Sequence, residues 1–342
     1  MAEPQSPSSI LLVCLDNAGD LVFSSALTRP LRERFPRARL GLWCKAYAQE
    51  VGALFPDIDE LFASDPFWDR SPGRGKGSRR LFVRTLLAVR SRRYDCAIIT
   101  SPQWRACAAV WASGIASRIA LARHRNAPFL TTVLPAEDRS QPIVSELSRL
   151  LVPFGIARHD LRYELEPGKL DLRIAALRAV LGSDPFVMLH PFASVPERRA
   201  PLPIWLELAV AMPSRGLAVL WNGSSRELDL LRAEASARPE WRYIDRVSPG
   251  SFADAAAAAS IARLYIGNDS GPLHVSNALG TACVGVFPPS LYPRTRLQGV
   301  GESREVVTSS PEAVTTKAIL AAVDGLLSEL PLPVAMGDQR PV

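Results

Sequence analysis

Residues 261–287 read IARLYIGNDSGPLHVSNALGTACVGVF. An apolar run precedes a polar turn with two glycines, and a second apolar run closes the stretch. The pattern predicts a strand, a tight turn, a short helix and another strand, with Pro272 in the first helical turn, where its missing N–H costs nothing. Unpaired N–H groups and the helix dipole favour an anion at such a helix start. We therefore expect Ser270 and Gly271 to offer backbone N–H groups to a ligand such as a pyrophosphate. Asp269 repels phosphate, so it either takes hydroxyl donors from a ligand or fixes the turn.

Apolar strand-like runs alternate with helical patterns along the chain, which is typical of parallel sheets wound with crossover helices. In the first half we expect strands at 10–15, 39–43 and 95–100, weaker strands at 60–62 and 117–122, and helices at 21–35, 46–55 and 79–91. Pro30 should kink the first helix because it removes one helical hydrogen bond. In the second half we expect strands at 186–190, 218–222, 241–245, 262–266 and 282–287, and helices at 171–181, 202–212, 226–237, 251–260 and 311–330. The fold class is therefore α/β, with two similar windings.

The two windings should meet within residues 164–169, a charged stretch that contains Pro and Gly. The predicted domains are 1–165 and 166–330, followed by a proline-rich tail at 331–342 that we expect to be flexible. Ligands of doubly wound sheets lie beyond the carboxyl ends of the strands. The turns at 16–20 and 267–274 follow such strand ends, so the two domains can present them to each other across a cleft.

Composition is that of a globular protein, since apolar residues make up 47% and charged residues 22% of 342 residues. The net charge of +6 is unevenly distributed. Nine basic residues and no acidic one lie in one stretch: Arg70, Arg74, Lys76, Arg79, Arg80, Arg84, Arg90, Arg92 and Arg93. Such a patch attracts lipid head groups, nucleic acid or a phosphorylated acceptor. The alternative is a solvated loop and helix face without a partner.

The five cysteines are scattered through mostly apolar runs, and no pair has C-x-x-C spacing. This favours reduced, buried thiols in a cytosol over disulfides or a zinc site. The apolar run at 10–15 is too short for the core of a signal peptide, and no stretch reaches eighteen uncharged apolar residues. We expect a cytoplasmic protein that does not span the membrane.

A second candidate site lies in the sequence LDNAGD at residues 15–20, between the first strand and the first helix. Gly19 lets the backbone turn tightly or approach a ligand. Asp20 is either a helix cap, which contributes about 1 kcal/mol, or a general base that takes a hydroxyl proton. As a cap, it would have Asp16 as its solvent-exposed neighbour.

Two further turns follow strands of the second half. The loop HPFASVPERRAPL at 190–202 carries a hydroxyl and two arginines, which suit phosphate oxygens because guanidinium offers paired donors. A plain surface loop is the alternative, and His190 is more often a structural histidine than a catalyst. In WNGSSRE at 221–227, Glu227 could accept ribose hydroxyls or merely start a helix. No G-x-G-x-x-G, P-loop or G-x-S-x-G motif is present, which disfavours dinucleotide oxidoreductases, P-loop enzymes and serine hydrolases.

Taken in order, these turns resemble glycosyltransferase family 9, the ADP-heptose:lipopolysaccharide heptosyltransferases. The similarity runs from about Ile10 to Val323 and is carried by LLVCLDNAGDLVFSSAL, VMLHPFASVPERRAPLPIWLELA, VLWNGSSREL and LYIGNDSGPLHVSNALGTACVGVFPPSLYPRT. The N-D-S-G-P-x-H segment is its most specific element. The resemblance implies a GT-B fold of two Rossmann-like domains facing a cleft, with the acceptor on the N-terminal domain and the nucleotide-sugar on the C-terminal one. It also implies inversion at the anomeric centre, without a metal or another cofactor.

The resemblance assigns roles by position in the family's motifs. Asp20 matches the catalytic base, with Asp16, Asn17 and Gly19 on the acceptor side. On the donor side, Ser194, Arg198, Asp269, Ser270, Gly271 and His274 match the family's motifs, where His274 contacts the phosphates or holds the turn. Glu227 is a further donor-side candidate, from its own turn. Preset donors such as Arg198 would stabilise the charge of the leaving diphosphate without magnesium. Asp20 must then reach across the cleft, so domain closure is an expected step.

Four positions depart from the family pattern: Arg198 for lysine, Ala200 for tryptophan, Phe192 for glycine and Cys14 for a basic residue. Where K-R-W-P is common, this chain has Arg198-Arg199-Ala200-Pro201, and arginine and lysine are not equivalent on phosphate. Phe192 stands where glycine is usual, and Cys14 stands where a basic residue is frequent. These departures bear on the choice of donor more than on the fold.

The leading hypothesis is transfer of a heptose from ADP-heptose to a lipopolysaccharide core-type acceptor, with peripheral contact at the inner face of the membrane. A second hypothesis keeps this chemistry but uses a soluble natural product or another envelope glycan as acceptor. A third is a non-catalytic nucleotide-sugar-binding protein, and a fourth an epimerase or hydrolase of the same fold. Nucleic acid is not an expected partner, because no recognised motif accompanies the basic stretch.

Overall fold

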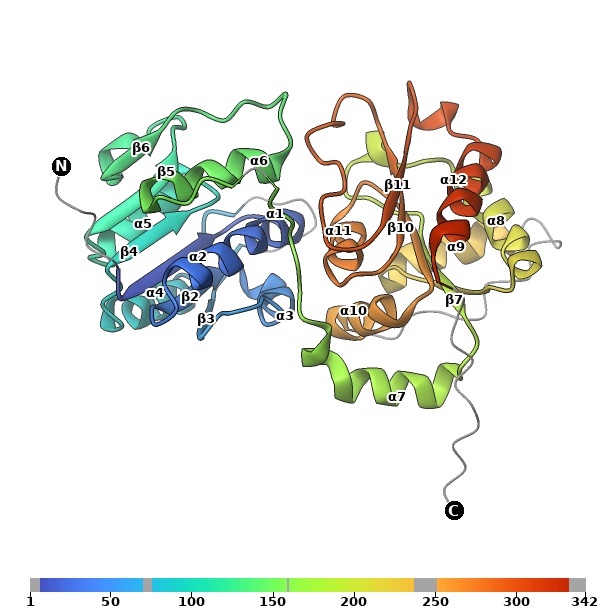
Figure 1. Ribbon diagram of the computed structural model, residues 1–342, viewed down its shortest axis with the longest axis horizontal. Helices are drawn as coiled ribbons and strands as arrows, with labels where there is room; N and C mark the ends of the chain where they lie inside the picture. Colours follow the sequence, from blue (N-terminus) through green and yellow to red (C-terminus); the bar gives the residue numbers. More distant parts are fainter. Residues whose placement is uncertain (1–6, 70–75, 159, 237–250, 332–342) are drawn as a thin grey trace, which may run out of the picture. The chain divides into compact units, whose positions relative to one another are not determined.

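The computed structural model describes residues 7–69, 76–158, 160–236 and 251–331. The chain divides into two compact units, Met1–Glu166 and Pro167–Val342 (Figure 1). This division falls within the Pro-Gly stretch of the sequence. The predicted strand at 241–245 lies outside the described residues, as do Arg70, Arg74 and nearly all of the predicted tail.

Unit 1 contains a parallel six-stranded sheet with the order β3-β2-β1-β4-β5-β6. The strands are β1 Ser9–Cys14, β2 Arg39–Cys44, β3 Glu60–Ala63, β4 Cys96–Ile99, β5 Ser117–Leu121 and β6 Thr132–Leu134. The helices are α1 Ala18–Ser24, α2 Thr28–Arg34, α3 Gln49–Gly52, α4 Arg79–Ser91, α5 Trp104–Ala112 and α6 Ile143–Ser148. Every residue of β1 is buried, which explains its uninterrupted apolar sequence. The strand order reverses between β1 and β4, and this switch point is where ligands of such sheets bind.

The helix expected at 21–35 is two helices, α1 and α2, joined by a 3-10 turn at Ser25–Leu27. Pro30 has no N–H to bond the carbonyl four residues earlier, within that turn, so the expected kink becomes a break. The helix expected at 46–55 was also too long, because a 3-10 turn at Ala46–Ala48 precedes the short α3. No pattern in the sequence predicted α5, α6 or β6.

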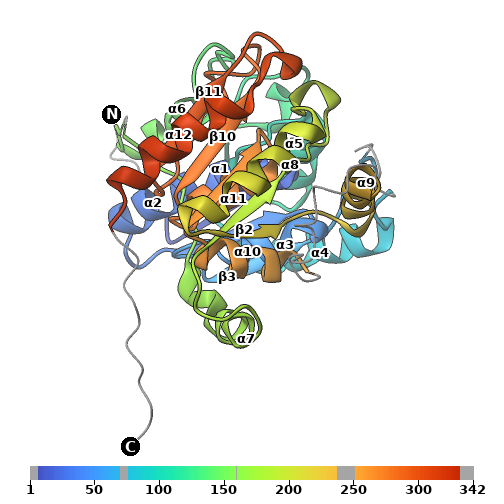
Figure 2. The same ribbon diagram turned by 90° about the vertical axis from the view of Figure 1, so that its right-hand side faces the viewer.

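Unit 2 contains a parallel five-stranded sheet with the order β11-β10-β9-β7-β8. The strands are β7 Phe186–His190, β8 Ala218–Trp221, β9 Leu264–Asn268, β10 Cys283–Phe287 and β11 Ser303–Val307, the last not predicted. The helices are α7 Asp171–Leu181, α8 Leu202–Ala211, α9 Ser225–Ser236, α10 Phe252–Ile261, α11 Gly271–Ala278 and α12 Thr316–Glu329. Figure 2 shows α8 and α12 side by side over the sheet, where they cover a core that includes Val187, Leu189 and Trp205. The switch point of this sheet lies between β7 and β9.

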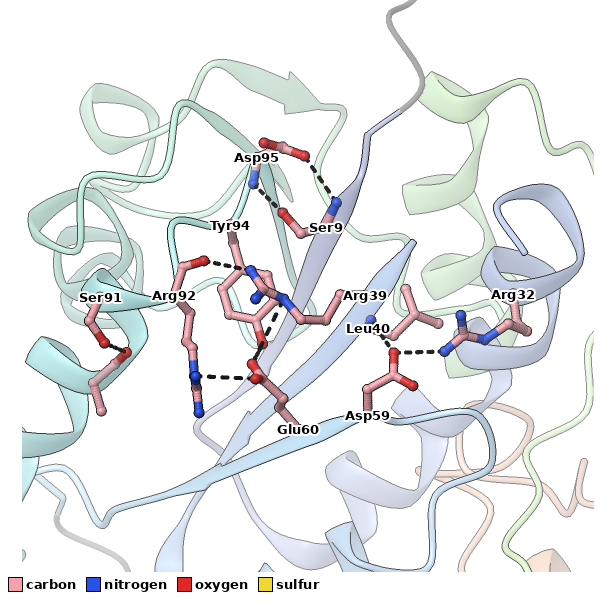
Figure 3. Close-up of polar contacts among 11 residues, drawn as sticks. Ser9, Arg32, Arg39, Leu40, Asp59, Glu60, Ser91, Arg92, Tyr94 and Asp95 are labelled. Carbon is pink, nitrogen blue, oxygen red and sulfur yellow. Dashed lines mark hydrogen bonds and ion pairs between the residues drawn. The ribbon is translucent and has the colours of Figure 1, made fainter. Parts of the chain in front are cut away.

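A network of charged residues joins the N-terminal ends of β2 and β3 in the unit 1 sheet (Figure 3). The candidate site lies at the opposite, C-terminal ends of the strands. Glu60 accepts a hydrogen bond from the Tyr94 hydroxyl at 2.6 Å and pairs with Arg92 at 3.2 Å. The Arg39 guanidinium lies 4.9 Å from the centre of the Tyr94 ring. Burial raises the pKa of Tyr94, so this hydroxyl stays protonated as a donor. The network stabilises the sheet at a distance from the strand ends that carry the candidate site.

Candidate active site

The turn after β9 has the predicted strand–turn–helix geometry. Ser270 is the N-cap of α11 in an extended conformation, and Pro272 lies in the first turn. The Ser270 side chain makes no capping hydrogen bond, and its Oγ is buried without a hydrogen-bond partner. Within the described residues, the N–H groups of Ser270 and Gly271 donate no backbone hydrogen bond. The start of α11 therefore presents unused donors, as an anion-binding turn requires.

Asp269 fixes this turn, which was one of the two roles that the sequence left open. Its side chain is only 1% exposed. Oδ1 lies 3.2 Å from Nε2 of the buried His274, while Oδ2 accepts a hydrogen bond from Thr295 Oγ1 at 3.0 Å. Oδ2 also lies 3.3 Å from Nη1 of Arg198. A buried carboxylate is stable only when it is paired and hydrogen-bonded. Asp269 meets this requirement through His274, Thr295 and Arg198, and it thereby fixes the positions of these three side chains.

Arg198 ends a 3-10 turn, Pro196–Arg198, in the loop after β7. One guanidinium nitrogen is anchored on Asp269, and Nε is buried without a hydrogen-bond partner. The side chain is 26% exposed, so the guanidinium is held in place and still accessible. Ser194 lies exposed in the same loop.

Asn268 holds both ends of this loop, a role that the sequence analysis missed. Its side chain is fully buried; Nδ2 donates to the Pro191 carbonyl at 2.8 Å and Oδ1 accepts from the Ala200 N–H at 3.2 Å. The sequence could have indicated this role, because Asn268 is a polar amide at the end of an apolar strand. A buried amide needs hydrogen-bond partners, so such a residue is expected to hold neighbouring backbone. Thr295 was also missed, because no local pattern connects it with Asp269.

Phe192 and Ala200, which depart from the family pattern, are both packed in the protein interior. Phe192 is buried, and a Cβ at Gly223 would lie 3.0 Å from its ring. Ala200 is buried as well, and its carbonyl accepts a hydrogen bond from Trp205 Nε1 at 3.3 Å. Both residues belong to the core of unit 2, so they support the loop after β7 from the side of the protein interior.

A cavity of about 230 Å³ lies in unit 2 among the ends of β7 and β8 and helices α9, α10 and α11. The alanines of α10 form one wall because their side chains are too small to fill the space. Phe252, Pro272 and Val275 add apolar surface, and His190, Asn222 and Glu227 supply polar groups. An apolar cavity with a few polar groups is typical of a small-molecule site.

His190 is a neutral imidazole at the edge of this cavity. Nδ1 lies 2.9 Å from the Asn222 carbonyl, which can only accept, so Nδ1 carries the proton. Burial lowers the pKa of His190, and this effect outweighs the Asn222 carbonyl and the Glu227 carboxylate, which act in the opposite direction. Nε2 is therefore left as a hydrogen-bond acceptor.

Glu227 starts a helix, one of its two predicted roles, and also lines the cavity. Its Oε2 accepts hydrogen bonds from the N–H and the hydroxyl of Ser224 at 2.8 and 2.7 Å. The Glu227 N–H lies 3.4 Å from the Ser224 hydroxyl, which completes a reciprocal arrangement at the start of α9.

In unit 1, the turn after β1 leads into α1. The N-cap is Asn17, and Asp20 lies in the first turn of the helix as its third residue, so Asp20 is not the cap, which was one of its two possible roles. Gly19 lies inside α1 and is not among the residues with positive φ, so a left-handed turn does not explain it; close approach to a ligand stays a prediction. The Asp16 carboxylate accepts from the Asn17 N–H at 3.0 Å and from Gln103 Nε2 at 3.2 Å. Gln103 follows β4, so this contact bridges the switch point.

Tyr47 and Lys45 complete this corner of unit 1 and were not singled out from the sequence. The Tyr47 hydroxyl accepts the Ala18 N–H at 2.7 Å and lies 3.4 Å from Asn17 Oδ1. Lys45 is buried, with Nζ 2.6 Å from the Asp69 carboxylate. Tyr47, which follows β2, and Gln103, which follows β4, thus fix the helix start that carries Asp20.

The cysteines are buried and free, as predicted. Burial raises the pKa of Cys14 to about 12, and the carboxylates of Asp20 and Asp16 add to the effect. Cys14 is therefore an uncharged core residue where the family often has a basic one.

In the described part of the chain, no cluster of three or more His, Cys, Asp or Glu side chains could hold a metal ion. Likewise, none of the described helices is long and apolar enough to cross a membrane.

Two parallel Rossmann-like sheets, each with candidate ligand groups at its switch point, define the GT-B class of glycosyltransferases. The model of glycosyltransferase family 9 (heptosyltransferase) matches residues 82–321. The chain belongs to this family and is a glycosyltransferase enzyme.

The curated relatives include lipopolysaccharide heptosyltransferase 2 of Escherichia coli K12, 23% identical over 82% of this chain and 83% of the relative. The Salmonella typhimurium LT2 protein of the same name is 22% identical over the same shares. Similar solved structures include a family 9 glycosyl transferase from Veillonella parvula, with a TM-score of 0.79 and 17% identity, covering 94% of this chain and 98% of that one. The E. coli ADP-heptose lps heptosyltransferase II has a TM-score of 0.76 and 19% identity over the same shares. These structures establish the shared fold.

Proposed function

We propose that the protein is an inverting glycosyltransferase that transfers a heptose from ADP-heptose to a lipopolysaccharide core-type acceptor. The names of the relatives support the sugar and the acceptor, since both curated relatives are lipopolysaccharide heptosyltransferases. Similar folds were solved as E. coli WaaC with ADP and with ADP-2-deoxy-2-fluoro heptose. The observation in this chain that carries the proposal is Arg198, anchored on buried Asp269 in the same unit as the unpartnered Ser270 hydroxyl.

On the donor side, the cavity of unit 2 binds the nucleotide, and the adenine ring packs against the alanines of α10. Arg198 Nε, the Ser270 hydroxyl and the first N–H groups of α11 take the diphosphate oxygens. Buried donors without partners are unfavourable, and a phosphate would satisfy them. As the bond from the anomeric carbon to the phosphate oxygen breaks, charge grows on the leaving group. Donors already fixed there lower the barrier more than they tighten substrate binding.

On the acceptor side, Asp20 is the general base. The acceptor hydroxyl attacks the anomeric carbon from the face opposite the diphosphate, which inverts its configuration, and the hydroxyl proton passes to the Asp20 carboxylate. Asp16 and Asn17 hold the turn that positions Asp20 through Gln103 and Tyr47. The reaction is proposed to need no metal, because Arg198 and α11 supply the positive charge.

Thermal unfolding with ADP-, UDP-, GDP- and dTDP-sugars tests the donor, because a ligand that binds the folded state stabilises it more the higher its concentration is relative to its Kd. We expect selective stabilisation by ADP-heptose, followed by transfer to a deacylated lipopolysaccharide core. Stabilisation by UDP- or dTDP-sugars alone would reject ADP-heptose as the donor. Donor consumption without acceptor would indicate a hydrolase or epimerase, and binding without consumption would indicate a nucleotide-sugar-binding protein. Transfer only to a soluble compound or to another envelope glycan would reject the core-type acceptor.

A further inference from the structure

Helix α4 of unit 1, labelled in Figure 1, runs from Arg79 to Ser91. It exposes aliphatic side chains together with arginines. Its buried face is formed by Phe82, Thr85 and Val89. On the opposite side, Val83 is 50% and Leu87 56% exposed. Residues three and four apart in a helix share a face. The exposed face therefore consists of Arg80, Val83, Arg84 and Leu87, and we call it the α4 face.

The α4 face keeps its positive charge. Within the described residues, Arg80 and Arg84 make no ion pair or hydrogen bond, and both are exposed. Neither α4 nor the neighbouring α5 contains an acidic residue. Glu60, at the start of β3, is engaged by Arg92 and Tyr94 (Figure 3).

We propose that the α4 face docks onto an anionic lipid bilayer. The arginines would contact lipid phosphates, and Val83 and Leu87 would enter the boundary between head groups and acyl chains. A nucleic acid would use the arginines alone, because phosphates gain nothing from two half-exposed aliphatic side chains. The combination of both kinds of residue on one helix face favours the bilayer. This inference is independent of the donor and of the transfer reaction.

Vesicle co-sedimentation of the full chain tests the proposal, with phosphatidylcholine vesicles and with vesicles that also contain phosphatidylglycerol. We expect binding to the anionic vesicles that weakens as salt is added. Arg80→Gln with Arg84→Gln should lower the partition constant about thirtyfold, since each arginine near an anionic surface contributes about fivefold. Val83→Ser with Leu87→Ser should also weaken binding, because less apolar surface enters the interface. Circular dichroism checks that each variant is folded.

Helix α7 provides a control for the residue types substituted, because it exposes Leu172 and Arg178 on unit 2 without placing them on one face. Arg178→Gln with Leu172→Ser should leave vesicle binding unchanged, whereas Arg84→Gln with Leu87→Ser should weaken it. The proposal is overturned if the wild type does not bind anionic vesicles at low salt, or if the α7 variant weakens binding equally. It is also overturned if the aliphatic variant binds like the wild type and a DNA duplex competes fully, because the face would then be a nucleic-acid site.

Discussion

Asp269→Asn removes the charge of the buried carboxylate that anchors Arg198, and it keeps the size of the side chain. In the wild type, Asp269 holds Arg198 Nη1 at 3.3 Å, Thr295 Oγ1 at 3.0 Å and His274 Nε2 at 3.2 Å. Breaking a buried ion pair costs about 3–5 kcal/mol. Arg198 is a quarter exposed and can recover some hydration, so we expect a loss of about 2–4 kcal/mol. For a domain the size of unit 2, this lowers the Tm by about 4–16 °C.

Nucleotide binding should weaken as well, although Asp269 itself is too buried to contact the nucleotide. Arg198 loses its anchor, and a hydrogen bond to a charged group contributes about 1.5–3 kcal/mol, so the ADP affinity should fall about 10- to 150-fold. Differential scanning calorimetry measures the change in Tm. Titration calorimetry with ADP, at a temperature below the Tm of the variant, measures the change in affinity.

Asp324→Asn is the control, because it removes the partner of Arg215 on the surface of the same unit. That pair is short, at 2.6 Å, but Asp324 is 54% exposed, and exposed pairs contribute about 0–1 kcal/mol. We expect a small change in Tm and unchanged ADP binding. An Asp269→Asn variant that binds ADP like the wild type would refute the anchoring role.

Three further predictions concern single side chains. Thr295→Val should lower the ADP affinity because the hydroxyl that donates to the buried carboxylate is lost, whereas Thr295→Ser should restore it in the same titration; equal behaviour of the two variants would contradict this. Gly41→Ala should lower the Tm by several degrees, because a Cβ there would lie 2.1 Å from the Tyr94 hydroxyl and would push that side chain away from Glu60; an unchanged Tm would argue against that packing. Asp95→Asn should destabilise the protein at neutral pH: burial tends to raise the pKa of Asp95, but hydrogen bonds from Ser8 and Ser9 prevail and lower it. Figure 3 shows the contact between Asp95 and Ser9. A lowered pKa in the folded state means stability that is present above the ordinary value of about 3.9 and lost as the pH falls through the folded-state value. The difference in Tm between this variant and the wild type should therefore shrink in acid; a constant difference would contradict the hydrogen bonding.

The sequence predicted the two windings because the strands buried on both faces read as uninterrupted apolar runs. It did not predict α5, whose alanine-rich sequence lacks a clear polar face, or β6, which is short and lies at the edge of its sheet. The break near Pro30 was expected only as a kink, because a 3-10 turn has no distinct sequence pattern.

Site residues that lie within one sequence motif were predicted. Site residues that depend on contacts between distant parts of the chain were missed. Ser270 and Gly271 follow from the turn itself. The anchoring of Arg198 on Asp269 does not, since it depends on a loop after β7 meeting a turn after β9. Asn268 and Thr295 act through contacts that only the folded sheet creates.

In the proposed reaction, unit 1 supplies the general base and unit 2 holds the donor, and the Asp20→Asn variant separates these two roles. With ADP-heptose and a deacylated core acceptor, kcat should fall about 10²- to 10⁴-fold, the usual contribution of a general base. The Kd for ADP should stay unchanged, because the cavity and Arg198 belong to the other unit. Asp16→Asn, in the same turn, should have a much smaller effect on kcat. Full transfer activity in the Asp20→Asn variant would contradict the account.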